Sequence, residues 1–123
     1  MKYFLWVFLG GGMGSIFRYA ISKFISIPQN TFPYPTLIAN LIGCLLIGFI
    51  MGNAIKHGTY TSSQTLFFAT GFCGGLTTFS TFSLEGIELL RSGNLGIFLF
   101  YTLTSVVMGL FAVGLGIYLS RSI

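Results

Sequence analysis

The stretch GGLTTFSTF, residues 74–82, interrupts what is otherwise a long apolar segment. Two adjacent glycines precede two β-branched threonines, and hydroxyl side chains follow at Ser80, Thr81 and Ser83. Backbone can leave a helix at membrane depth only where protein or a cavity surrounds it. We therefore expect a helix over residues 64–90 that is broken in its middle. The alternative is a continuous helix whose hydroxyls bond back to its own carbonyls.

The composition around this stretch indicates a membrane protein. Of 123 residues, 54% are hydrophobic and 7% are charged, whereas a soluble domain carries about 25% charged residues. The charges separate long neutral runs, and a spanning helix needs roughly 20 mostly apolar residues. The chain therefore has room for four spans in one transmembrane domain, residues 1–123, and none for a soluble catalytic domain.

Turn signals divide the chain into four expected helices, which makes the predicted fold class all-α. The expected ranges are residues 3–24, 36–55, 64–90 and 95–119. All three prolines, Pro28, Pro33 and Pro35, lie between the first two ranges, and Pro35 suits the first turn of a helix. Ser62 or Ser63 is the expected cap of the third helix.

Glycines four residues apart recur in the expected helices. The pairs are Gly10 with Gly14, Gly48 with Gly52, and Gly71 with Gly75. Such pairs let helices approach closely, either within one subunit or between subunits, and both interpretations stay open. Because four short helices enclose little polar space, we expect at least a dimer.

The six cations divide equally between the two expected sides of the membrane. Lys2, Lys56 and Arg121 fall on the side of the termini, and Arg18, Lys23 and Arg91 fall on the other. Positive residues normally accumulate in cytoplasmic loops and set the orientation. The equal division predicts a chain that inserts both ways and pairs as an antiparallel, dual-topology homodimer. The alternative is a weak bias set by something that this count omits.

Few residues offer the chemistry of catalysis, metal binding or nucleic-acid recognition. Cys44 and Cys73 lie in apolar runs, where a free cysteine behaves as a small hydrophobe. The single histidine, His57, has no nucleophile, base and acid arranged with it. The cations lie singly at span ends and form no basic stripe. We therefore expect neither an enzyme nor a nucleic-acid-binding protein.

Neutral polar and aromatic side chains share helix faces in three of the expected spans. They are Thr36 with Asn40, Phe79 with Phe82, and Tyr101 with Ser105. Amides and hydroxyls donate hydrogens, and an aromatic ring is positive at its edge. Such groups, without charged partners, suit a small anion that must bind and still move on. For the phenylalanines alone, core packing or lipid contact is the alternative.

Ionisable side chains are confined to the ends of the spans. Arg18, Glu85 and Glu88 are expected on one side of the membrane, where each either serves a function or extends to the interface. No carboxylate lies in the first, second or fourth span. This argues against the alternative function, a small multidrug-type proton-coupled transporter. A purely structural subunit would not need polar faces on three spans.

The motifs resemble those of the Fluc fluoride channels, also called CrcB proteins, over the whole chain. Residues 74–82 resemble the family signature, and GGGMGSIFRY, residues 10–19, resembles its glycine-rich first-helix motif. Residues 36–43 match its Thr-x-x-x-Asn-x-x-Gly arrangement, and Tyr101 with Ser105 match a tyrosine and a hydroxyl on its fourth helix. Two departures are Ser15, where alanine is expected, and Gly109, where some relatives have a third hydroxyl.

The resemblance implies a homodimer with two pores that exports fluoride passively across the inner (plasma) membrane and relieves fluoride toxicity. By this likeness, the residues of the fluoride path are Thr36, Asn40, Phe79, Thr81, Phe82, Tyr101 and Ser105. Backbone carbonyls of Gly74 and Thr77 would hold a structural Na⁺ at the dimer interface. Arg18 matches an arginine of the vestibule or of the interface, and Glu85 matches an acid whose role stays open.

Overall fold

The computed structural model describes residues 1–123, and all of its regular elements are helices. The elements are α1 (Lys2–Phe24), α2 (Tyr34–His57), α3 (Ser63–Thr65), η1 (Leu66–Cys73), α4 (Gly74–Leu76), α5 (Phe79–Arg91) and α6 (Leu95–Ser122). Three of them, α1, α2 and α6, are long and apolar enough to cross a membrane. The all-α prediction is confirmed, and the expected ranges 3–24, 36–55 and 95–119 lie inside these three helices.

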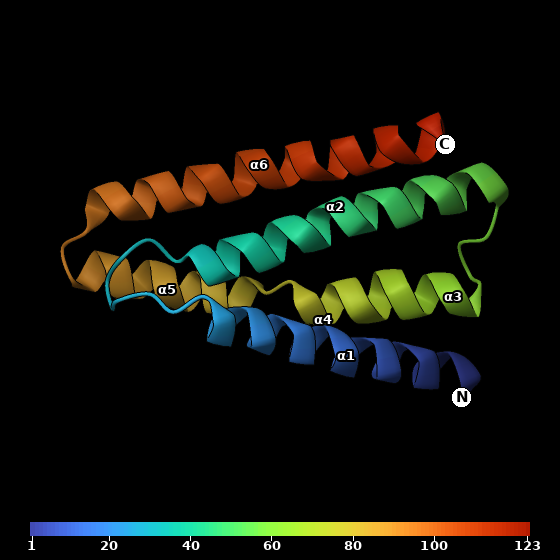
Figure 1. The fold of residues 1–123 in the computed structure, drawn as a ribbon, viewed down its shortest axis with the longest axis horizontal. Helices are drawn as coiled ribbons and strands as arrows, with labels where there is room; N and C mark the ends of the chain where they lie inside the picture. Colours follow the sequence, from blue (N-terminus) through green and yellow to red (C-terminus); the bar gives the residue numbers. More distant parts are fainter.

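The helices run back and forth between two ends of the molecule. Both termini and the α2–α3 connection lie at one end, and the α1–α2 loop and the α5–α6 turn lie at the other (Figure 1). The segments α3, η1, α4 and α5 follow one another from the first end to the second (Figure 1). Three of the six cations therefore lie toward each end, as the sequence predicts, with Arg18 set back from its end against Gly75.

Local signals in the sequence set where the helices start and stop. Pro35 stands in the first turn of α2, where a missing amide hydrogen costs nothing. That helix ends at His57, and Gly58 follows it with a φ of 66°, the left-handed conformation that glycine adopts most readily. The Ser62 hydroxyl caps α3 by accepting a hydrogen bond from the Thr65 amide at 3.1 Å. The prediction that Pro35 opens a helix is confirmed, and of the two serines expected as a cap, Ser62 is the one that caps α3.

Close backbone contacts hold the helices in two pairs, α2 against α6 and α1 against η1 and α4. A Cβ at Gly10 would overlap the Phe67 carbonyl oxygen, and one at Gly116 would overlap that of Leu45. The glycine pairs of the sequence lie in these contacts: Gly10, Gly14, Gly71 and Gly75 between α1 and η1–α4, and Gly48 and Gly52 against α6. Of the two open interpretations, packing within one subunit accounts for all three pairs.

The outer helices leave most of their apolar side chains exposed. α1 buries only Gly10 and Gly14, and α6 exposes large side chains along its length. One core cluster, formed by Leu37, Leu89 and Tyr101, lies between α2, α5 and α6. A bundle that turns apolar side chains outward and glycines inward is suited to lipid as its solvent.

Candidate functional site

Two consecutive threonines separate α4 from α5. Thr77 has ψ 154° and Thr78 has φ −150° and ψ 123°, so both are extended. The Thr77 hydroxyl donates to the Cys73 carbonyl at 2.8 Å, and the Thr78 hydroxyl accepts from the Thr81 amide at 3.1 Å. Thr77 thus completes the hydrogen bonding of the helical stretch before it, and Thr78 caps the helix that follows. The hydroxyl back-bonding that a continuous helix would use occurs at Thr77 only.

The side chain of Asn40 on α2 binds the backbone of this interruption. Its amide nitrogen donates to the Thr78 carbonyl at 3.3 Å, and its oxygen accepts from the Thr78 amide at 2.8 Å. The second bond fixes the orientation of the side-chain amide, because a backbone N–H can only donate. One amide hydrogen of Asn40 remains available to another acceptor.

A cavity of about 560 Å³ opens beside the interruption, and we call it the central cavity. It lies between α2, η1, α4, α5 and α6, and no charged side chain lines it. Six residues singled out from the sequence line it: Asn40, Gly74, Thr77, Phe79, Phe82 and Ser105. The hydroxyl of Ser105 is buried and has no hydrogen-bond partner. The central cavity therefore combines two neutral donors, on Asn40 and Ser105, with two phenyl rings.

The two phenyl rings differ in how the subunit supports them. Phe82 packs against Tyr101, with ring centroids 5.1 Å apart, and Phe79 packs against Phe82 at 5.8 Å. Phe79 itself is 79% exposed. Phe82 is therefore packed within the subunit, whereas Phe79 lies at the exposed side of the cavity.

Glu85 gathers two of the remaining predicted residues around its carboxylate. The Thr36 hydroxyl donates to one oxygen and the Tyr101 hydroxyl to the other, each at 3.0 Å. Both hydroxyl residues are buried, Tyr101 completely. The sequence placed Thr36 and Tyr101 among hydrogen donors for an anion; in this structure their hydrogens point to Glu85. The sequence left the role of Glu85 open, because nothing in the spacing pairs it with helices α2 and α6.

Arg18 and Thr81 lie on a smaller cavity of about 270 Å³, which Thr36 also lines. The Arg18 guanidinium donates from Nε to the Gly75 carbonyl at 3.1 Å and so ties α1 to α4. Of the predicted polar residues, Asn40 and Ser105 therefore line the central cavity, and Thr36 and Thr81 line the smaller one.

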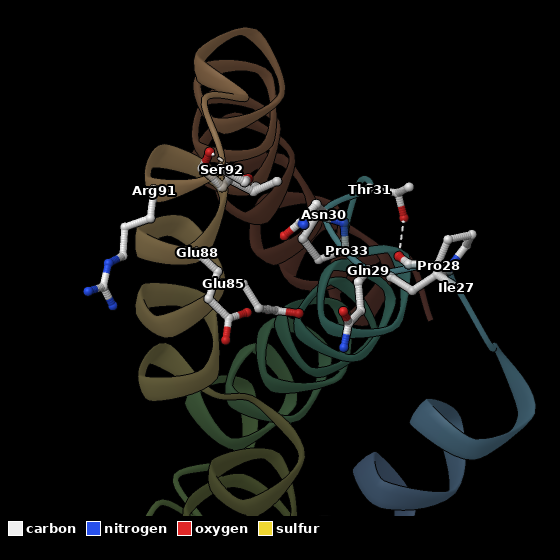
Figure 2. A pocket seen from close by; sticks show the side chains of 11 residues that line it. Ile27, Pro28, Gln29, Asn30, Thr31, Pro33, Glu85, Glu88, Arg91 and Ser92 are labelled. Carbon is white, nitrogen blue, oxygen red and sulfur yellow. Dashed lines mark hydrogen bonds between the residues drawn. The ribbon is translucent and has the colours of Figure 1, made fainter.

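A third cavity, of about 580 Å³, lies between the α1–α2 loop and α5. Glu85 and Glu88 point into it from α5, facing the loop that carries Gln29 and Asn30, while Arg91 points away (Figure 2). No group of three His, Cys, Asp or Glu side chains that could hold a metal ion forms in the subunit. On its side away from the core, Glu85 thus faces a cavity at the end of the molecule that carries the α1–α2 loop.

Backbone oxygens are the remaining candidate ligands for a cation. The Thr77 carbonyl accepts no hydrogen bond, and both Gly74 and Thr77 line the central cavity. Gly74 has open space where a Cβ would stand. Unpaired carbonyls suit a hard cation such as Na⁺, so these residues fit the ion that the family resemblance implies.

Comparison with known proteins is consistent along the whole chain. The sequence profile of the family described as "CrcB-like protein, Camphor Resistance (CrcB)" matches residues 5–117. A protein of Flavobacterium psychrophilum named "Fluoride-specific ion channel FluC" is 41% identical, with 100% of both chains covered. Proteins of the same name are 42% identical in Bacteroides fragilis, with 98% of each chain covered, and 51% identical in Clostridium perfringens, over 71% of this chain and 69% of the other.

A match over most of the chain, together with apolar helices of spanning length, makes this a multi-pass integral membrane protein. The chain belongs to the CrcB-like protein family.

Proposed function

We propose that the chain is a fluoride-selective channel that lets F⁻ leave the cell passively through the plasma membrane and so relieves fluoride toxicity. The proposal rests on the relatives named as fluoride-specific channels and on one structural observation. The central cavity presents neutral donors and phenyl rings and no charged side chain. A conducting site must bind an ion firmly enough to admit it and weakly enough to release it, and neutral donors meet both demands.

Within the central cavity, each group has a distinct part in the proposal. The free amide hydrogen of Asn40 and the unpartnered Ser105 hydroxyl replace water around the anion. Phe79 and Phe82 turn positive ring edges toward it. Thr36, Thr81 and Tyr101 extend the polar track outside the cavity. The hydroxyls of Thr36 and Tyr101 are hydrogen-bonded to Glu85.

The working unit in the proposal is an antiparallel homodimer with two pores. In each subunit α3, η1, α4 and α5 together make a broken third span, which brings the count to four. The equal division of cations between the two ends supports insertion in both orientations. The 79% exposure of Phe79 supports a second subunit that covers the open side of the central cavity.

The dimer interface is also where the proposal places Na⁺. Carbonyl oxygens of Gly74 and Thr77 from two subunits would supply four ligands, and the ion would hold the subunits together without being transported. Arg18, bound to the Gly75 carbonyl, keeps α4 against α1 next to this site. The proton-coupled transporter is not supported, because α1 carries no carboxylate and the relatives are named as channels.

Ion release from liposomes tests the proposal directly. Purified protein is reconstituted into vesicles loaded with fluoride or with chloride, and efflux is followed with ion-selective electrodes. Fast fluoride release with little chloride release supports the channel; equal release of both ions, or release of neither, contradicts it. A reporter fused to the C-terminus tests topology separately, since detection on one side of the membrane alone contradicts dual insertion.

A further inference from the structure

A continuous series of aromatic rings runs from the central cavity to the α1–α2 loop. Phe79 contacts Phe82, and Phe82 contacts Tyr101. On another side of Tyr101, Phe32 approaches edge to face, with centroids 5.4 Å apart and planes at 76°. Phe32 continues the series to Phe100 at 5.5 Å. The family resemblance assigns no role to Phe32, which is the only member of the series that no helix carries.

Two hydrogen bonds, one of them from outside the loop, fix the backbone that carries Phe32. The Asn94 side chain, before α6, donates to the Asn30 carbonyl at 3.3 Å. Asn30 has φ 59°, a left-handed conformation that asparagine tolerates better than most residues. The Thr31 hydroxyl donates to the Pro28 carbonyl at 2.7 Å (Figure 2). Phe32 is therefore presented to the core by a defined loop.

Tyr101 depends on its neighbours for its orientation. Its ring is fully buried between Phe82 and Phe32, and its hydroxyl reaches Glu85 at 3.0 Å. Removing the Phe32 ring leaves space beside Tyr101, and a ring with space beside it no longer keeps its hydroxyl aimed at one oxygen. The loss would act on the Glu85 carboxylate and on the Phe82 ring together, because Tyr101 contacts both.

We propose that Phe32 is a positioning residue for conduction: it holds Tyr101 so that the hydroxyl binds Glu85 and the ring supports Phe82. This inference rests on the proposed channel function. It makes the α1–α2 loop, which lies outside the helices, part of the machinery that sets the fluoride path.

The test compares two phenylalanines of the same cluster. Phe32→Leu removes the ring that touches Tyr101, and Phe100→Leu removes a ring that touches Phe32 and that has no ring contact with Tyr101. We expect Phe32→Leu to lower the fluoride efflux rate between about twofold and tenfold, the range for losing the one pair of its three that involves Tyr101. Phe100→Leu is expected to keep the wild-type rate, and Phe32→Tyr, which retains the ring, should restore it.

A double-mutant cycle separates positioning from general packing. Tyr101→Phe removes the hydroxyl alone, so in that background Phe32→Leu should cause a smaller further loss of efflux than it causes in the wild type. Losses that multiply independently would overturn the proposal, as would wild-type efflux in Phe32→Leu. The same cycle can be measured by thermal unfolding, which needs no fluoride flux. If the wild type conducts nothing, the channel function is contradicted, and the unfolding temperatures still show whether Phe32 and Tyr101 are coupled.

Phe32→Met serves as a second variant, because methionine fills the space without a ring. We expect it to fold and to lose less efflux than Phe32→Leu, because it fills space beside Tyr101 that leucine leaves open. Should neither variant fold while Phe100→Leu does, Phe32 is needed for folding and the positioning proposal is overturned.

Discussion

The side-chain amide of Asn40 binds both backbone polar groups of Thr78, accepting from its N–H at 2.8 Å and donating to its C=O at 3.3 Å. Thr78 lies where the helix stops, so neither group has the helical partner that it would otherwise have. Backbone groups at membrane depth must be paired within the protein. A single residue on α2 therefore makes the interruption between α4 and α5 tenable while it also lines the central cavity.

The variant Asn40→Ala should lose both stability and conduction. It leaves two partly buried backbone groups of Thr78 unpaired, each at a cost of up to about 1–3 kcal/mol, so the unfolding temperature should fall clearly. Fluoride efflux should fall as well, because the donor in the central cavity is gone. Asn53→Ala is the matched control, since Asn53 is exposed on the same helix and its side chain makes no hydrogen bond. Equal unfolding temperatures for the two variants would contradict the role given to Asn40.

Glu85→Ala should destabilise the subunit more than Glu88→Ala does. The first change deprives the buried Thr36 and Tyr101 hydroxyls of their acceptor, which costs about 1–3 kcal/mol for each one left unpaired. Glu88 lies one helical turn away and is exposed, and its side chain makes no hydrogen bond, so its loss should leave stability within about 0.5 kcal/mol. Thermal unfolding in detergent measures the difference, and a ranking in the reverse order would refute it.

Gly116→Ala should separate α2 from α6, whereas Gly114→Ala should not. A Cβ at Gly116 would overlap the Leu45 carbonyl and lie 2.6 Å from the Phe49 amide nitrogen, so backbone must shift. At Gly114 nothing lies within 4 Å of the added atom. Replacing glycine by alanine inside a helix stabilises the fold by about 0.5–1 kcal/mol where there is space for the methyl group. Unfolding temperatures should therefore move in opposite directions. A neutral Gly116→Ala variant would argue against the close helix contact.

Phe79→Ile should impair fluoride efflux without weakening the fold. The ring is 79% exposed in the subunit, so its removal opens no cavity within the core. An aliphatic side chain has no positive ring edge to offer an anion. Efflux is measured beside the elution volume of the purified protein, which should remain that of the wild type. Phe82→Ile should show the same loss of efflux, and wild-type efflux in both variants would remove the ring-edge role.

Removing Na⁺ during purification should weaken the dimer. Organic cations are too large to be held by the Gly74 and Thr77 carbonyls, so exchange of Na⁺ for N-methylglucamine leaves four carbonyl oxygens facing one another. The expected result is a larger monomer fraction in cross-linking and lower efflux, both restored when Na⁺ is added back. Indifference of assembly and of efflux to Na⁺ would count against the site.

Much of the architecture follows from local features of the sequence. Long neutral runs, prolines between them and a serine cap placed α1, α2 and α6 and the start of α3, because these signals act within a few residues. The equal division of the six cations between the two ends could be predicted from the order of the spans alone. Helical spacing predicted that Phe79 and Phe82 share a face, whereas the family resemblance implied that these two, Asn40 and Ser105 belong to one path; all four line the central cavity.

Contacts between distant segments required the tertiary structure. No spacing rule joins Glu85 to Thr36 and Tyr101, which lie 49 and 16 residues away. The same holds for Phe32, whose contact with Tyr101 depends on how the α1–α2 loop folds back.

Sequence by itself determined that this chain is a helical membrane protein, because hydrophobic runs, helix caps and charge counts depend only on residues close together in the chain or on their order. The tertiary structure decided which neutral groups remain free and which are already paired. It gives the hydroxyl hydrogens of Thr36 and Tyr101 to Glu85 and leaves that of Ser105 without a partner. The physical reason is that hydrogen-bond satisfaction depends on the positions of atoms in space, and residues far apart in the chain supply both halves of each bond.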